Sequence, residues 1–101
     1  MINIILIMTK YKIKPYSYEQ AKKIGVDIEP STNPKYKIDI YTKEGKYITS
    51  IGARGYSDYP TFIEEDGKEY ADYRRALYHQ RHKKDIHKVG SRGWFAGLIL
   101  W

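Results

Sequence analysis

The sequence contains no cysteine, which removes disulfide bonds, thiol nucleophiles and cysteine-ligated zinc sites together. This absence agrees with a reducing compartment. Long hydrophobic runs are also missing, because the apolar stretch from Met1 to Met8 is far shorter than the roughly 20 residues of a membrane span. That stretch lacks a basic start and a small-residue cleavage site. We therefore expect no signal peptide, no secretion and no membrane partner.

Acidic residues are in the minority, with 12 Asp and Glu against 18 Lys and Arg, which gives a net charge of +6. Such an excess favours polyanionic partners, namely DNA, RNA or an acidic protein surface. The alternative is that lysine only keeps the chain soluble. Phenylalanine and tryptophan are scarce, with two residues each, but there are 11 tyrosines. Tyrosine combines an apolar ring with a polar tip, so it suits half-buried positions and binding faces.

A chain of 101 residues fits one domain. The pattern predicts an α+β domain: a β-hairpin packed on one long helix, with a short N-terminal helix and an apolar C-terminal segment. We assign residues 9–101 to this single domain. Residues 1–8 are predicted to be an apolar N-terminal extension or strand.

The clearest local signal is the hairpin, where apolar and polar residues alternate on both sides of residues 44–45. A two-residue turn there places Ile38 opposite Ile51. In this register the apolar residues of both strands share one face, which supports the pairing. Tyr47 is expected on the same face.

Two helices are predicted. The first is a short helix that starts at a capping-box spacing of Ser17 and Gln20 and ends at Gly25. The connector that follows, residues 26–34, is expected to be irregular because it contains two prolines and a Ser-Thr-Asn cluster.

The second helix is long, and we predict that it covers residues 68–88 with Tyr70, Tyr73 and Leu77 as its inward stripe. Residues 61–63 before it are expected to be extended.

The candidate functional surface is cationic. Arg74, Tyr78 and His82 recur every four residues and therefore share one side of the long helix. Arginine offers a planar fork for phosphate, and tyrosine can stack on a base or bond a phosphate oxygen. The predicted nucleic-acid-binding residues are Arg54, Arg74, Arg75, Tyr78, Arg81, His82, Lys83 and Lys84. The Lys and Arg members would contact phosphates, and Tyr78 and His82 would orient them. The alternative is a solvated cationic face in which a few residues pair with Asp72, Asp85 or Glu69.

The loop around Arg54 is a weaker candidate. Its flanking glycines would let backbone amides approach an anion. The alternative is a structural turn in which Asp58 pairs with an arginine of the long helix.

Catalysis and metal binding are not expected, and no cofactor is predicted. His79, His82, Asp85 and His87 are the metal candidates, but His87 lies on a different side of the helix from His79. The enzymatic alternative is a metal-dependent nuclease, which would require the fold to bring Asp58, Asp66 and His82 together.

Several segments resemble a known family. They are Tyr11-Lys-Ile-Lys-Pro-Tyr16, Ala21-Lys-Lys-Ile-Gly25, Lys37-Ile-Asp-Ile40, Ser50-Ile-Gly-Ala53, Gly55-Tyr-Ser-Asp-Tyr-Pro60, Tyr70-Ala, Arg74-Arg75, Tyr78, Arg81-His82, Lys84-Asp85, Gly93-Trp-Phe-Ala96 and Leu98-Ile-Leu-Trp101. Over residues 9–101 the chain resembles short uncharacterised proteins encoded by large DNA viruses of algae and other protists. The resemblance implies a viral source and a location in the virion or inside the host cell, but no established activity.

The leading functional hypothesis is therefore a small basic viral protein, virion-associated, that binds nucleic acid through the phosphate backbone without catalysing a reaction. The alternative is a minor capsid or scaffold protein, oligomeric or bound to capsid protein, whose apolar ends at residues 4–8 and 95–101 insert between subunits.

Overall fold

The computed structural model describes residues 10–101, and the predicted extension or strand at residues 1–8 lies outside them. In chain order the described elements are α2 (Pro15–Lys23), β1 (Asp27–Pro30), β2 (Tyr36–Tyr41), β3 (Tyr47–Ala53), α3 (Tyr59–Asp66), α4 (Lys68–Arg81) and α5 (Arg92–Ile99). The α+β class, with a β-hairpin and a long helix, is confirmed, but the predicted packing of the hairpin on the long helix is wrong, because the sheet packs on α2 and α5 while α4 packs on α3. No helix in this part of the chain is both long and apolar enough to pass through a bilayer.

The sheet is antiparallel, in the order β1-β2-β3. Ile38 pairs with Ile51, as the two-residue turn predicts. A register shift between Ile40 and Tyr41 then pairs Tyr41 with Tyr47. Such an irregularity re-aims the side chains that follow it. Tyr47 is 55% exposed and its hydroxyl lies 2.8 Å from Ser50 Oγ, so its predicted place on the apolar face is wrong.

Strand β1 lies within the segment that was expected to be irregular. It pairs with β2, which places Ile28 opposite Ile40 and buries both side chains. Pro30 ends this strand at the edge of the sheet, where a missing N–H is tolerated. The proline and polar cluster therefore mark the end of a strand.

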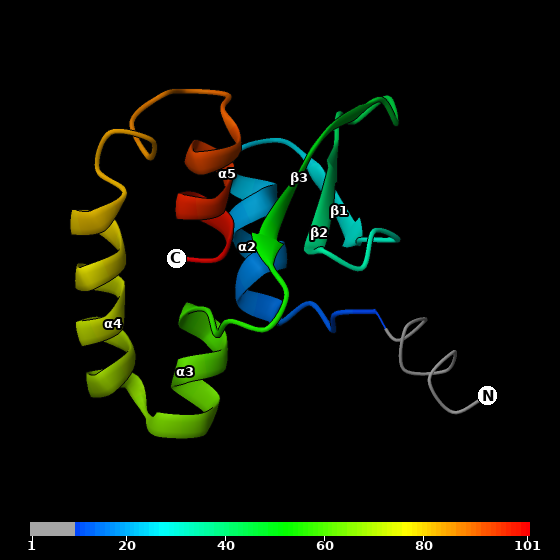
Figure 1. Cartoon of the computed structure of the whole chain (residues 1–101). Coiled ribbons are helices and arrows are strands. Elements are labelled where there is room, and N and C mark those ends of the chain that lie inside the picture. Colours follow the sequence, from blue (N-terminus) through cyan, green and yellow to red (C-terminus); the bar gives the residue numbers. More distant parts are fainter. Residues whose placement is uncertain (1–9) are drawn as a thin grey trace.

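The core lies between the sheet and two helices. Ile38, Ile40, Ile51, Ile99 and Leu100 are almost completely buried. Helices α2 and α5 cover this face, whereas α4 packs on α3 at the far side of α5 (Figure 1). The apolar C-terminal segment completes this core, in which Phe95, Ile99 and Leu100 are buried. Residues 95–101 are therefore not a free arm, and this support for the capsid alternative is removed.

Helix α2 is held by the end of α5. Ser17 Oγ donates to the Ile99 carbonyl at 2.8 Å, and Gln20 Nε2 donates to the Leu98 carbonyl at 3.2 Å. The predicted capping box is therefore wrong. The helix starts at Pro15 instead, because the fixed φ of proline suits the first helical turn. Gly25 has φ +75° and follows the helix end, as predicted.

Helix α3 replaces the extended piece expected at residues 61–63. Asp58 Oδ1 accepts a hydrogen bond from the Thr61 backbone N–H at 3.0 Å and caps the helix. Gly67 ends α3 and precedes α4 with φ +87°, a value that favours glycine.

Helix α4 ends at Arg81, and residues 82–90 form turns, so the predicted end near Lys88 is wrong. The predicted inward stripe is wrong as well, because Tyr70 and Tyr73 are 43% and 57% exposed. Ala71 is fully buried instead, since its small side chain allows α3 to pack closely. Because Ala71 faces inward, the side of α4 that also carries Tyr78 faces the body of the protein.

Candidate nucleic-acid interface

A cleft of about 720 Å³ lies between α4, α5 and the end of the hairpin. Four of the predicted residues line it: Arg74, Tyr78 and Arg81 from α4, and His82 directly after the end of α4. The opposite wall comes from the end of β3 and the loop that follows it, and Phe62, Leu100 and Trp101 add apolar lining. Clefts of this size and mixed polarity hold small molecules or parts of larger ligands.

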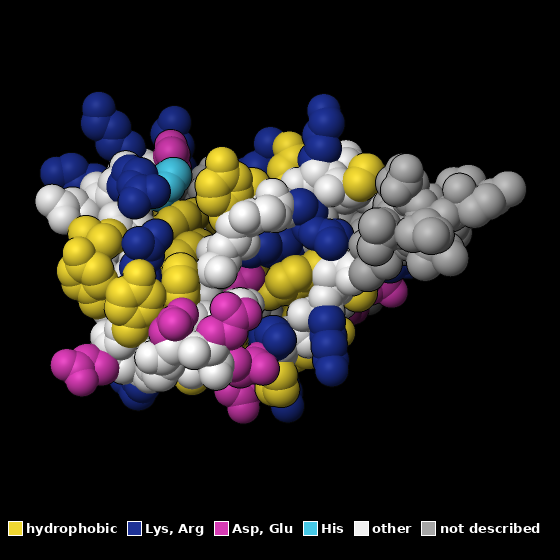
Figure 2. Space-filling view, turned by 60° about the horizontal axis from the view of Figure 1, so that its bottom comes forward, with side chains coloured by type: hydrophobic (Ala, Val, Ile, Leu, Met, Phe, Trp, Pro, Cys, Tyr) yellow, Lys and Arg dark blue, Asp and Glu magenta, His cyan; other side chains and the backbone are white. Residues whose placement is uncertain are grey.

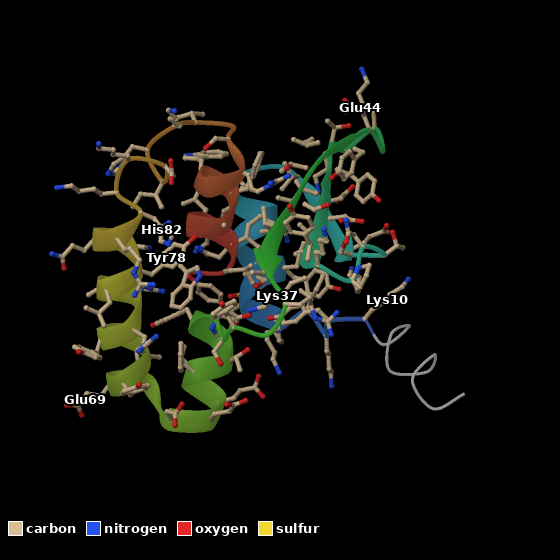
Figure 3. The ribbon with its side chains drawn as sticks, viewed as in Figure 1. Lys10, Lys37, Glu44, Glu69, Tyr78 and His82 are labelled. Atoms are coloured by element: carbon tan, nitrogen blue, oxygen red, sulfur yellow. The ribbon has the colours of Figure 1, made fainter. Side chains whose placement is uncertain are left out.

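Tyr78 forms a rigid aromatic wall of the cleft. Its ring stacks on Trp101 with a centroid distance of 4.4 Å and an interplanar angle of 6°. The His82 ring lies 4.3 Å from Tyr78, inclined by 30° (Figure 3). Burial, and secondarily the charge of Asp85, raise the pKa of Tyr78, so its phenol stays neutral. Tyr78 and His82 therefore form part of the cleft wall.

Arg74 places a charge in the cleft wall. Its guanidinium carbon lies 5.2 Å from the centre of the Phe62 ring. Its Nε is buried and has no hydrogen-bond partner among residues 10–101. A buried donor without a partner is unfavourable, so an anion in the cleft would improve its surroundings.

Arg75 was predicted to contact phosphate, but its side chain is part of the framework. Its Nε donates to the Trp101 carbonyl at 2.7 Å, and its Nη2 donates to the Tyr16 hydroxyl at 3.0 Å. The guanidinium also lies 3.5 Å from the centre of the Tyr59 ring. These contacts join α4 to α2, α3 and the C-terminal segment. Arg75 is therefore removed from the set of phosphate contacts.

A basic rim borders the cleft, and we define it as Arg81, Lys83, Lys84, Lys88 and Arg92. Arg81, Lys88 and Arg92 line the cleft, whereas Lys83 and Lys84 lie outside its lining, in the turns that follow α4. All five side chains are exposed, and Asp85 is the only acidic residue between Arg81 and Arg92. The ion pairs found within residues 10–101 use other cations. Figure 2 shows Lys and Arg side chains gathered around a histidine at one edge of the molecule, away from the acidic group along the lower edge.

Lys88 and Arg92 were missed by the sequence interpretation. Both line the cleft, although they follow the end of α4. The chain reverses after Arg81 through a series of turns, which returns the start of α5 to the cleft. The Gly90-Ser91 pair was a signal for this reversal.

Arg54 occupies a half-buried position where the loop leaves β3, and its backbone N–H donates to the Lys35 carbonyl at 3.0 Å. Gly55 follows it with φ +93°. The expected partnership of Asp58 with an arginine is wrong. Asp58 Oδ2 instead accepts from Lys37 Nζ at 2.9 Å and from the Tyr11 hydroxyl at 2.6 Å.

This carboxylate is held as an anion. Burial by itself would raise the pKa of Asp58, but the charge of Lys37 and the hydrogen bonds to the carboxylate outweigh burial and lower the pKa. The same burial, together with the hydrogen bond to Asp58, raises the pKa of Tyr11. The cluster of Tyr11, Lys37 and Asp58 is therefore a satisfied structural link beneath the cleft.

The described residues contain no group of three or more His, Asp or Glu side chains arranged to hold a metal ion. His79, His82, Asp85 and His87 are thus not brought together as ligands, nor are Asp58, Asp66 and His82. Burial, and then the charge of Arg75, lower the pKa of His79. A neutral His79 fits a packed position between α4 and α5.

No protein-family model, no curated protein and no solved structure matches the chain.

Proposed function

We propose that the protein binds nucleic acid without catalysing a reaction, mainly through the phosphate backbone, and that the basic rim is the contact surface. The observation that carries the proposal is the rim itself: five exposed cations close in sequence to one carboxylate, with Arg81, Lys88 and Arg92 also lining the cleft. Lysine and arginine in this arrangement neutralise phosphates and release counterions, which supplies most sequence-independent affinity. The viral resemblance makes a viral genome the natural polyanion.

The backbone under the rim is ordered by its own hydrogen bonds. The amides of Asp85 and Ile86 both donate to the His82 carbonyl, at 2.9 and 3.0 Å. Ser91 Oγ lies 3.3 Å from the Asp85 carbonyl and also caps α5 through the Trp94 amide at 3.1 Å. The rim cations therefore project from a closed series of turns and from the two helix ends that flank it. Binding should need little ordering of the backbone, which reduces its entropic penalty.

The predicted residues take different parts in this proposal. Arg81, Lys83 and Lys84 contact phosphates, joined by Lys88 and Arg92. Arg74 adds charge inside the cleft, Tyr78 and His82 form its wall, and Arg54 stays a peripheral member. No observation in the described residues favours the capsid alternative over this function.

The test is a salt titration of DNA and RNA binding. We expect log Kd to depend linearly on log salt, with a slope of about 0.9 per phosphate neutralised on duplex DNA. The variant Lys83→Ala with Lys84→Ala should weaken binding and lower this slope by about 2.

The matched control is Lys22→Ala with Lys23→Ala, which removes the same charge from the exposed end of α2. This control should keep the slope nearly unchanged. Affinity independent of salt, or equal losses in both double variants, would contradict the proposed function.

A further inference from the structure

The cleft behind the basic rim contains more aromatic surface than phosphate contact requires. Tyr36, Tyr56, Phe62, Tyr78 and Trp101 all line it. Aromatic rings beside cations are the arrangement that single-stranded nucleic acid uses, because every base has a flat face that can stack. Duplex DNA keeps its bases inside the helix and would leave these rings unused.

Tyr56 is the ring best placed to meet a base. Its side chain is 76% exposed, more than any other large apolar side chain described apart from Val89, and it lines the cleft. It follows Gly55, whose φ of +93° sets the turn that presents it. Exposure of a tyrosine ring at the lip of a cleft leaves its face accessible to a stacking partner.

The other rings are already engaged. Tyr78 and Trp101 stack on each other at 4.4 Å and form a fixed wall on the α4 side of the cleft, whereas Tyr36, whose ring centre lies 4.9 Å from Arg92, pairs with Ala53 on the hairpin side. A base entering from the mouth would meet Tyr56 on the hairpin side and the stacked Tyr78 and Trp101 on the other. The guanidinium of Arg74 lies in the same wall, with its Nε unpartnered among residues 10–101.

Charge supports the same occupant. The cleft lining contains Lys37, Arg74, Arg81, Lys88 and Arg92, and Asp85 is its single carboxylate. Lys37 is neutralised by Asp58, so the lining cations without an ion pair among residues 10–101 are Arg74 inside the cleft and Arg81, Lys88 and Arg92 of the basic rim. A nucleotide matches this lining of aromatic rings and cations, because its base is apolar on both faces and its phosphate is anionic.

We propose that the cleft accepts an unpaired base, so that the protein prefers single-stranded nucleic acid over duplex. This inference rests on the proposed function. The base stacks on Tyr56 inside the cleft while the flanking phosphates lie on the basic rim.

The experiment compares three ligands of equal length, roughly 12 nucleotides, within the usual site sizes for single strands. They are an oligothymidylate, the same strand with abasic sites, and a duplex. Fluorescence anisotropy at one fixed salt concentration gives Kd for each. We expect the strand with bases to bind at least tenfold more tightly than the abasic strand, since each base–aromatic stack contributes about tenfold to a hundredfold.

Tyr56→Ala should weaken oligothymidylate binding by about tenfold or more, without changing its salt slope or the duplex affinity. Tyr73→Ala is the matched control, because Tyr73 is 57% exposed on α4 and lies outside the cleft lining. Both variants alter exposed side chains, so both should fold. Circular dichroism confirms this before titration.

The outcomes separate the two proposals. Equal affinity for abasic and base-containing strands, or a Tyr56→Ala effect no larger than that of Tyr73→Ala, overturns the base-binding inference and leaves phosphate binding intact. Failure of all three ligands to bind overturns the proposed function itself.

Discussion

Lys37 Nζ lies 2.9 Å from Asp58 Oδ2, and the two side chains are only 6% and 1% exposed. A buried ion pair is not a large source of stability, because desolvation offsets much of the attraction. Breaking one side of it, however, leaves an uncompensated buried charge. The pair therefore fixes the position of the loop before α3 relative to β2.

The first prediction concerns this pair. Asp58→Asn keeps a residue able to cap α3 but leaves the buried Lys37 charge without its ion-pair partner. We therefore expect a loss of about 3–5 kcal/mol in the free energy of unfolding. Lys37→Met should be similarly destabilising. Urea denaturation of both variants and of the double variant measures the coupling. The double variant should lose much less than the sum, and simple additivity would show that the pair is not coupled.

The second prediction follows from the lowered pKa of Asp58. Burial opposes this shift, but Lys37 and the hydrogen bonds outweigh it. Because the folded pKa lies below the ordinary 3.8, the unfolded chain takes up the proton first. The stabilisation is therefore complete well above this value and is lost as the pH falls through it toward the folded pKa. Urea unfolding measured across the acidic range should show this loss in the wild type and a shallower one in Asp58→Asn.

The third prediction uses His79, whose pKa is lowered mainly by burial. The unfolded chain protonates near the ordinary value of 6.5 while the folded protein resists protonation. The free energy of unfolding should therefore decrease as the pH falls below that value, until the folded pKa is reached. His79→Gln removes the titrating group, so its stability should vary less over this interval. An identical pH dependence in the variant and the wild type would contradict the assignment.

The fourth prediction separates two arginines of α4. Arg75→Met should lower the free energy of unfolding by about 1–3 kcal/mol, because the Trp101 carbonyl and the Tyr16 hydroxyl lose their donor. It should leave the salt slope of nucleic-acid binding unchanged. Arg81→Ala should do the reverse, with stability within about 0.5 kcal/mol of wild type and a slope lower by about 0.9. A lower slope for Arg75→Met would return that residue to the interface.

The fifth prediction concerns the contact between the turns and α5. A Cβ on Gly97 would lie 2.8 Å from Ile86 Cγ2 and 3.2 Å from Ile86 Cβ. Alanine inside a helix normally stabilises by about 1 kcal/mol relative to glycine. Here we expect the opposite sign, a loss of about 1–3 kcal/mol from overpacking. Adding Ile86→Ala should recover part of the loss in urea denaturation, and a stabilised Gly97→Ala would refute the close contact.

The hairpin could be predicted because its information is local: the alternation of apolar residues and one glycine fix the register that pairs Ile38 with Ile51. The orientation of α4 could not. Tyrosines at helical spacing imitate an apolar stripe, but Tyr70 and Tyr73 are outside, and the small Ala71 marks the buried side. Only the packing of α3 on α4 decides between these faces.

The same distinction between local and long-range information applies to the candidate site. Exposed cations in sequence proximity, such as Lys83 and Lys84, can be recognised from charge alone. The partners of Arg75 and Asp58 lie far away in the chain, at Trp101, Tyr16 and Lys37, so sequence spacing has no information about them. Long-range partners decided which charges face solvent.

The hydrogen bond from Ser17 to Ile99 joins residues separated by 82 positions. During synthesis on a ribosome, α2 therefore emerges long before the carbonyl that it requires, and the part of the sheet face that α5 covers stays exposed in the meantime. Contacts between distant residues slow folding and prolong the exposure of apolar surface. We expect the native core to form only once α5 has left the exit tunnel, which makes the nascent chain a natural client of chaperones.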